Sequence, residues 1–197
     1  MTIERVVKNL PYLPIPNKSE IILTEIPSPS DLTTSSFAVI FENDGIWMIN
    51  NQKRGYDISG GHIEKGETPK QAVNREVKEE GNITLKFVKP IGYQKLIVKT
   101  DKPENYKYPF PISYMQFYWG ELYNISEYVE NNECKKPVYF SFNNSISDKN
   151  NWSCDDKKAL QWLHSQWDNN SILKTFILHA YKLRKDFNHI KSNMFKY

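Results

Sequence analysis

The chain has 197 residues, of which 39% are hydrophobic, enough for one domain with a substantial core. Its 26 Lys and Arg residues nearly balance 23 Asp and Glu residues, and the basic residues are scattered, which argues against a nucleic-acid-binding surface. No apolar run reaches transmembrane length, and Pro11, Pro14 and Pro16 interrupt the stretch where a signal sequence would lie. With Cys134 and Cys154 expected as free thiols, a cytoplasmic protein without membrane contact is predicted.

The N-terminal third is predicted to contain strands. Residues 1–19 are expected to run extended over the surface, and a strand is predicted at Ser19–Ile26, before the break of Pro27-Ser28-Pro29-Ser30. A β-hairpin is predicted next, because Asp44-Gly45 is a strong signal for a tight turn. Its two strands are Phe37–Phe41 and Ile46–Ile49.

A helix is predicted from Pro69 to about Gly81. Thr68 is a favourable N-cap, proline suits the first helical position, and Gln71 completes a capping box with Thr68. Asn82 tolerates the left-handed conformation that ends many helices, so the helix is expected to end there.

Three carboxylates share one face of this helix. Glu76, Glu79 and Glu80 stand at positions i, i+3 and i+4. Such a pattern alone is typical of a solvated acidic surface. Combined with a preceding glycine loop, Glu67 and Arg75, it favours a divalent-metal site, because hard oxygen ligands suit Mg²⁺ or Mn²⁺.

The remainder of the chain is predicted to supply more strands and then two helices. Residues 101–111 form a polar, proline-rich loop. The predicted strands are Ile83–Phe87, Gly92–Val98, Ser113–Leu122 and Val138–Phe142, and the predicted helices are Cys154–Trp167 and Ser171–Ile190. This order predicts an α+β or α/β fold in which a mixed β-sheet is sandwiched between helices.

The region around the helix resembles the Nudix box, G-x5-E-x7-R-E-U-x-E-E-x-G-U, where U is a bulky aliphatic residue. The matching positions are Gly61, Glu67, Arg75, Glu76, Val77, Glu79, Glu80 and Ile83. Asn82 replaces the last glycine, and Ser59 stands where many members have proline, a change expected to loosen the loop without removing a ligand. The resemblance to MutT-like Nudix hydrolases implies the same sandwiched mixed sheet.

The resemblance also implies roles for individual residues. The Gly61 carbonyl, Glu76 and Glu80 would be metal ligands, and Glu79 would be either a ligand or the base that activates water. Arg75 would pair with Glu67 and brace the loop against the helix. Mg²⁺ or Mn²⁺ is the implied cofactor.

A second segment resembles part of the NADH pyrophosphatases, which carry W-P-F-P-x-S-x-M after their box. Here Tyr108 replaces the tryptophan, and the matching positions are Pro109, Phe110, Pro111, Ser113 and Met115. The resemblance implies that Tyr108, Phe110, Ser113 and Met115 contact substrate and that Glu121, on a strand opposite the helix, is a further metal ligand. The alternative is a rigid turn that leads into a core strand.

The chain is predicted to be a single domain over residues 1–197. Residues 1–35 would be an N-terminal extension with the first strand, residues 36–167 the Nudix core, and residues 168–197 a C-terminal helix. The apolar side of that helix is expected to dock on the domain, and a homodimer interface is the alternative. The tryptophans at 152, 162 and 167 are expected in the core, and no role is assigned to His62.

These features predict a metal-dependent pyrophosphohydrolase that acts on a small nucleotide. It would cleave a nucleoside diphosphate linked to another group by water attack on phosphorus, with dinucleotides, nucleoside triphosphates and nucleotide sugars as candidate substrates. The alternative is a Nudix-fold module that senses a nucleotide without turnover. Such modules usually lack one or more box glutamates, whereas this chain has all of them.

Overall fold

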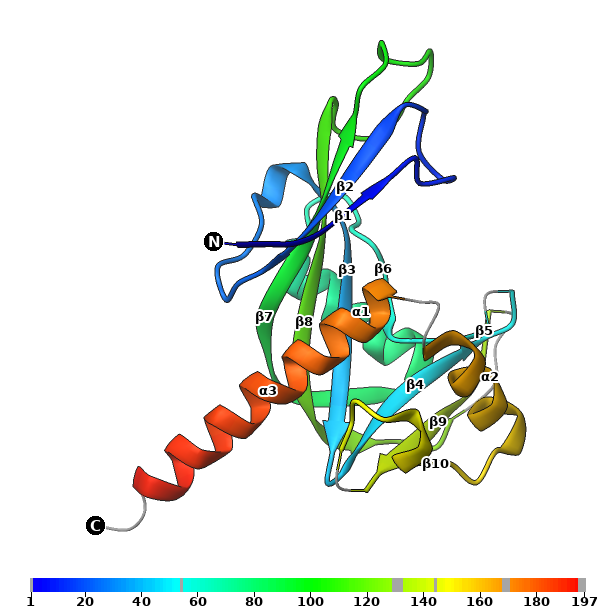
Figure 1. Ribbon diagram of the computed structural model, residues 1–197, viewed down its shortest axis with the longest axis vertical. Coiled ribbons are helices and arrows are strands. Elements are labelled where there is room, and N and C mark those ends of the chain that lie inside the picture. Colours follow the sequence, from blue (N-terminus) through cyan, green and yellow to red (C-terminus); the bar gives the residue numbers. More distant parts are fainter. Residues whose placement is uncertain (1, 54, 129–132, 144, 168–170, 195–197) are drawn as a thin grey trace.

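The computed structural model describes residues 2–53, 55–128, 133–143, 145–167 and 171–194. They form a curled mixed sheet of ten strands (Figure 1), in the order β1-β2-β7-β8-β3-β4-β9-β10, with β5 paired to β4 and β6 paired to β3. The β3–β8 pair is parallel and the other pairs are antiparallel. The strands are β1 Thr2–Lys8, β2 Asn17–Leu23, β3 Thr33–Glu42, β4 Gly45–Asn51, β5 Gly55–Asp57, β6 Ser59–His62, β7 Ile83–Val98, β8 Ile112–Ile125, β9 Cys134–Phe142 and β10 Trp152–Ser153.

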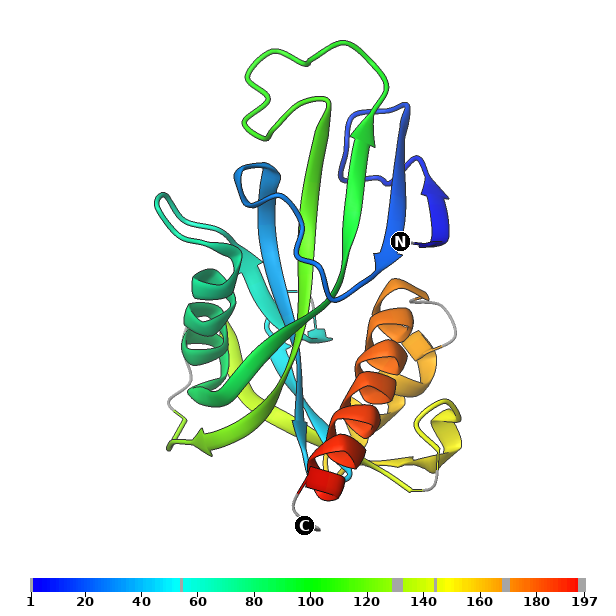
Figure 2. The same ribbon diagram turned by 90° about the vertical axis from the view of Figure 1, so that its left-hand side faces the viewer.

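Helices cover both faces of the sheet. Helix α1 (Pro69–Gly81) lies on one face, whereas α2 (Lys157–Trp167) and α3 (Ser171–Met194) pack against the other (Figure 2). Alternation along the strands divides the core, because successive side chains point to opposite faces. Thus Ala38 and Ile40 of β3 pack with α1, and Val39 and Phe41 belong to the cluster with α2 and α3. The predicted mixed sheet between helices is confirmed.

The local signals of α1 act as predicted. The Thr68 hydroxyl accepts a hydrogen bond from the Gln71 backbone N–H, and the Gln71 side chain accepts one from the Thr68 N–H. At the other end, Asn82 adopts the left-handed conformation with φ 51°. The predicted bounds Pro69–Gly81 are confirmed.

The N-terminal stretch departs from the prediction. Residues 1–19, expected to run extended over the surface, contain the strand β1, which pairs with β2 at the edge of the sheet. The prolines at 11, 14 and 16 all fall in the connection between these strands, where no ladder hydrogen bond is needed. Strand β7 is also continuous from Ile83 to Val98, because the irregularity near Pro90 bends the ladder without ending it.

Other boundaries shift by a few residues. The predicted hairpin is β3–β4, but Gly45 pairs with Glu42, so the turn is Asn43–Asp44. Helix α2 begins at Lys157 because the Asp156 carboxylate accepts hydrogen bonds from the first-turn N–H groups of residues 158 and 159. Strand β9 begins four residues earlier than predicted, at Cys134. The predicted connection at 168–170 lies outside the described residues.

The C-terminal helix docks on the domain, as expected. Its buried side includes Leu173, Phe176, Ile177 and Ala180, and the Phe176 ring stacks on Phe117 of β8 with centroids 3.7 Å apart. Both cysteines are free thiols. No helix in the described part of the chain has the length and hydrophobicity to cross a membrane.

Candidate active site

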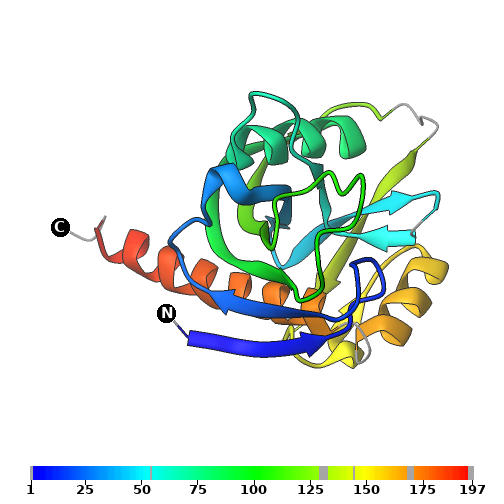
Figure 3. The ribbon, with the colours of Figure 1, turned by 90° about the horizontal axis from the view of Figure 1, so that it is seen from above.

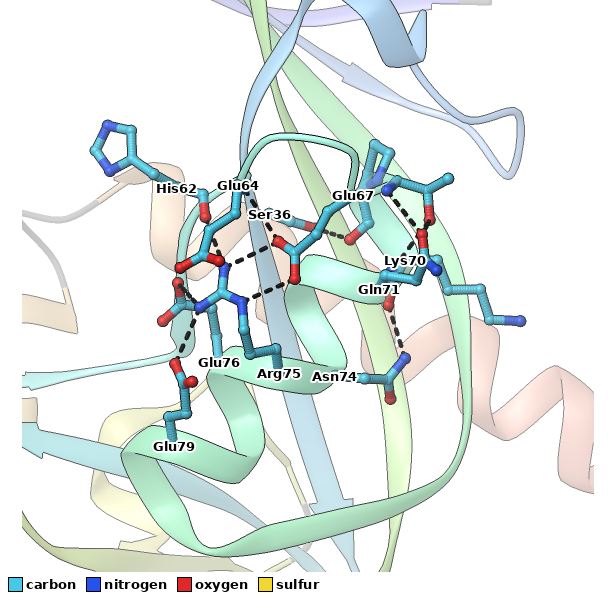
Figure 4. Close-up of polar contacts among 12 residues, drawn as sticks. Ser36, His62, Glu64, Glu67, Lys70, Gln71, Asn74, Arg75, Glu76 and Glu79 are labelled. Carbon is cyan, nitrogen blue, oxygen red and sulfur yellow. Dashed lines mark hydrogen bonds and ion pairs between the residues drawn. The ribbon is translucent and has the colours of Figure 1, made fainter.

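Arg75 is the centre of a polar network between α1 and the loop that precedes it (Figure 4). Its guanidinium donates to both carboxylate oxygens of Glu67, at 2.9 and 3.1 Å. It also donates to Glu76 at 2.9 Å, to Glu79 at 3.0 Å and to the His62 carbonyl at 2.9 Å. The predicted pair between Arg75 and Glu67 is therefore present, and one cation partners three carboxylates while fixing the loop to the helix.

The environment shifts the carboxyl pKa values in opposite directions. The hydrogen bond from Arg75 lowers the pKa of Glu67. Burial raises the pKa of Glu76, in spite of its own hydrogen bond to Arg75. Glu76 is therefore a carboxylate whose charge is only partly compensated by the protein, a property expected of a cation ligand.

Glu80 is held differently, by the loop rather than by Arg75. Its side chain is buried, with a residue exposure of 5%, and Oε2 accepts hydrogen bonds from the Ser59 hydroxyl at 2.8 Å and the Gly60 N–H at 2.9 Å. The expected loosening of the loop by Ser59 stays a prediction, but Ser59 also ties the loop to Glu80. Its hydroxyl provides a donor that proline lacks and orients Glu80.

Gly61 approaches Glu76 so closely that a side chain there would not fit. A Cβ atom on Gly61 would collide with the Glu76 carboxylate. The absent side chain thus lets the loop backbone and the Glu76 carboxylate share one space.

The chemistry of these groups fits a hard divalent cation, since all candidate ligands are oxygens. Within the described ranges, no three His, Cys, Asp or Glu side chains are gathered into a metal-binding group. Arg75 draws Glu76 and Glu79 to itself, while Ser59 and Gly60 hold Glu80. A cation would therefore replace Arg75 as the partner of Glu76 and Glu79.

The structure does not bring Glu121 to these carboxylates. On β8, Tyr118 and Leu122 face α1, whereas Phe117 and Trp119 face α3. Because side chains alternate along a strand, Glu121 points to the same face as Phe117 and Trp119. Its Oε1 accepts a hydrogen bond of 2.6 Å from Arg184 of α3. The expectation that Glu121 completes the metal site is corrected, because strand alternation turns its side chain to the opposite face.

A cavity of about 280 Å³ opens beside Gly61. Three of the predicted substrate contacts, Tyr108, Ser113 and Met115, line it, and Phe110 is not among the lining residues. The His62 ring, which the sequence assigned no role, also lines the cavity. It stacks on Tyr108 with centroids 5.8 Å apart, and its Nε2 lies 3.1 Å from the Tyr108 hydroxyl.

Sequence reasoning also missed Tyr12 and Leu13, which reach this cavity from the connection between β1 and β2. No local pattern marks them, because they are far in sequence from the box. The position of His62 directly after Gly61 was a weak signal that its side chain lies near the site.

The chain is similar to known proteins in sequence and in fold. The family model of the NUDIX domain matches residues 32–163. The Bacillus subtilis protein named "Putative 8-oxo-dGTP diphosphatase YtkD" is 28% identical over 103 residues, which are 52% of this chain and 59% of that protein, so the match spans less than two thirds of the relative. The solved structure of the Bacillus subtilis pyrophosphohydrolase BsRppH is 19% identical, with a TM-score of 0.60, and the alignment covers 90% of this chain and 96% of that one. That likeness shows the fold. Because the family model matches well over half of the sequence, the chain belongs to the NUDIX domain family.

Proposed function

We propose that this member of the NUDIX domain family is a divalent-metal-dependent pyrophosphohydrolase that cleaves a nucleoside diphosphate linked to another group, by attack of water on phosphorus. One juxtaposition carries the proposal: Gly61 borders the cavity lined by Tyr108 and Met115, and it lies so close to Glu76 that a Cβ atom on it would collide with the Glu76 carboxylate. A nucleotide whose base occupies the cavity would therefore extend its phosphates toward the carboxylates of α1.

Glu76, Glu80 and the carbonyl of Gly61 would hold Mg²⁺ or Mn²⁺. When bound, such ions neutralise the pyrophosphate and lower the pKa of an attacking water. Glu79 is our candidate for the base, because its side chain is 60% exposed and so accessible to water. Arg75 would keep Glu67 and the loop in place when the cation takes over its other partners.

A nucleoside triphosphate is the first candidate among the substrates. The name of the Bacillus subtilis relative supports it, and so does the cavity of about 280 Å³. That volume lies just below the roughly 300–1,000 Å³ typical of pockets for drug-sized ligands, and it suits one base rather than two. Because residues 108–115 resemble a segment of NADH pyrophosphatases, dinucleotides are the second candidate substrates.

The test is a phosphate-release screen with Mg²⁺ or Mn²⁺. It covers normal and oxidised nucleoside triphosphates, NADH, ADP-ribose and nucleotide sugars, with a coupled phosphatase for monoester products. Glu80→Gln is expected to lose turnover while keeping its fold, and Glu121→Gln is the matched carboxylate control, expected to stay active. Turnover of Glu80→Gln with unchanged Mg²⁺ dependence would refute the site assignment, and silence of the wild type across the panel would refute the activity.

A further inference from the structure

The N-terminal hairpin, here the segment of residues 2–23 that forms β1, β2 and their connection, reaches the candidate active site. The connection lies at the same end of the molecule as the loop between β7 and β8 (Figures 1 and 2), and Figure 3 looks onto that end. Tyr12 and Leu13 of the connection line the same cavity as His62, Tyr108 and Met115. The cavity is thus built by segments that are distant in sequence.

Hydrogen bonds fix the connection rather than leaving it as a loose turn. The buried Asn17 side chain accepts from the Leu10 N–H at 2.8 Å and donates to the carbonyls of Leu10, Leu13 and Pro14. The Lys99 N–H donates to the Pro16 carbonyl at 2.8 Å, joining the connection to the end of β7. Residues that line a cavity from such a fixed turn lose little entropy on binding a ligand.

Tyr12 is an exposed residue on this fixed turn. The residue is 59% exposed, yet its hydroxyl lies 3.4 Å from Nε2 of Gln94, which also donates to Ser19 at 2.6 Å. An exposed aromatic ring anchored at its polar end is suited to contact a flat ligand.

The rest of the cavity lining is apolar and aromatic. Leu96, Phe37 and Met115 supply apolar contacts, and the stacked rings of His62 and Tyr108 add a second aromatic element. Aromatic rings around an apolar pocket bind the π-face of a nucleobase.

We infer that the N-terminal hairpin is part of the substrate site and that Tyr12 and Leu13 contact the nucleobase, so that Tyr12 favours ligands that carry a base over ligands that do not. This inference rests on the proposed function, which places a nucleotide in the cavity. It gives the hairpin, which lies before the residues matched by the family model, a role in choosing the substrate.

Binding measurements test the inference without turnover. The affinities of AMP, GMP, CMP and UMP, and of inorganic phosphate as the ligand without a base, are measured by calorimetry. The wild type is expected to bind at least one of the nucleotides, and Tyr12→Ala is expected to weaken that binding by about tenfold, in line with the value of stacking on one aromatic ring. Binding of inorganic phosphate is expected to stay unchanged.

Three variants make the result specific. Tyr12→Phe keeps the ring and is expected to bind as the wild type does, which separates stacking from the contact with Gln94. Val6→Ala is the matched control, because Val6 is an exposed residue of β1 that does not line the cavity. Tyr108→Ala is expected to weaken nucleotide binding as Tyr12→Ala does. Melting temperatures and circular dichroism establish that each variant is folded.

The outcomes separate the two claims. Nucleotide binding that depends on Tyr12, in a protein that hydrolyses no nucleotide, would refute the proposed function and support the inference. Wild-type affinity in Tyr12→Ala together with weakened binding in Tyr108→Ala would overturn the inference and leave the proposed function intact. Absence of nucleotide binding to the wild type would overturn the inference as well.

Discussion

Arg184 binds Glu121 on the side of the sheet away from α1. Its Nε lies 2.6 Å from Oε1 of Glu121, its Nη1 donates to the Asn43 carbonyl at 2.8 Å, and its guanidinium lies over the Phe41 ring. Both charged side chains are largely buried. The pair therefore fastens α3 to the sheet.

Glu121→Gln is expected to destabilise the fold by about 2 kcal/mol, because a largely buried charged hydrogen bond is replaced by a neutral one. Its Mg²⁺ activation constant is expected to match that of the wild type. Denaturant unfolding and a Mg²⁺ titration of activity measure the two effects. A large rise in the Mg²⁺ activation constant, with an unchanged free energy of unfolding, would show that Glu121 is a metal ligand after all.

Ser59→Ala should weaken metal binding through Glu80. The variant loses the hydroxyl that donates to Oε2 and keeps the Gly60 N–H. Removal of a group that orients a metal ligand typically costs about 10–100-fold in metal affinity, and the Mg²⁺ activation constant should rise accordingly. Ser36→Ala is the matched control, since Ser36 is a buried serine on the neighbouring β3 that donates to the Pro69 carbonyl. Equal shifts in both variants would contradict the role of Ser59.

Glu76→Gln should make the metal-free protein more stable at pH 7. Burial raises the pKa of Glu76 above its ordinary value of 4.5, so the folded state binds the proton more tightly than the unfolded state. The protonated Glu76 carboxyl therefore contributes to the stability of the wild type at pH values below its pKa in the unfolded state. This contribution is lost as the pH rises through the pKa of Glu76 in the folded state.

Melting temperatures of both proteins in EDTA, between pH 4 and pH 8, check this prediction. The advantage of the glutamine variant should vanish toward pH 4, where the wild-type carboxyl is protonated. Addition of Mg²⁺ at pH 7 should stabilise the wild type more than the variant. A variant that is less stable than the wild type at pH 7 would mean that the bond from Arg75 outweighs the cost of burial.

Asn82→Ala should destabilise the end of α1 by about 1 kcal/mol, because alanine disfavours the left-handed conformation. Asn82→Gly should be close to neutral, since glycine adopts φ 51° without strain. Both variants lose the hydrogen bond from Asn82 to the Glu127 carbonyl, so their difference in unfolding free energy isolates the backbone effect. Equal stabilities would show that the side-chain bond, not the conformation, favours asparagine here.

Local chemistry explains why much of the site was predictable. The bounds of α1 follow from Thr68, Pro69, Gln71 and Asn82, which act within one turn of the helix ends. The pair of Arg75 and Glu67 was implied by the resemblance to the Nudix box, and the two residues lie on the helix and on the loop directly before it. The turn signal of Asp44-Gly45 likewise predicted the hairpin of β3 and β4.

Tertiary structure decided what depends on contacts between distant segments. Glu121 matched a ligand position in sequence, but the face to which a strand residue points depends on register, and its partner Arg184 lies on a helix near the other end of the chain. The hydrogen bond from Ser59 to Glu80 depends on the packing of β6 beside α1, which the local sequence does not reveal. The sequence by itself determined the helix, its acidic face and the chemistry expected there. The fold alone placed Tyr12 beside His62 and Tyr108, because a cavity forms from surfaces that meet in space and leaves no mark in local sequence.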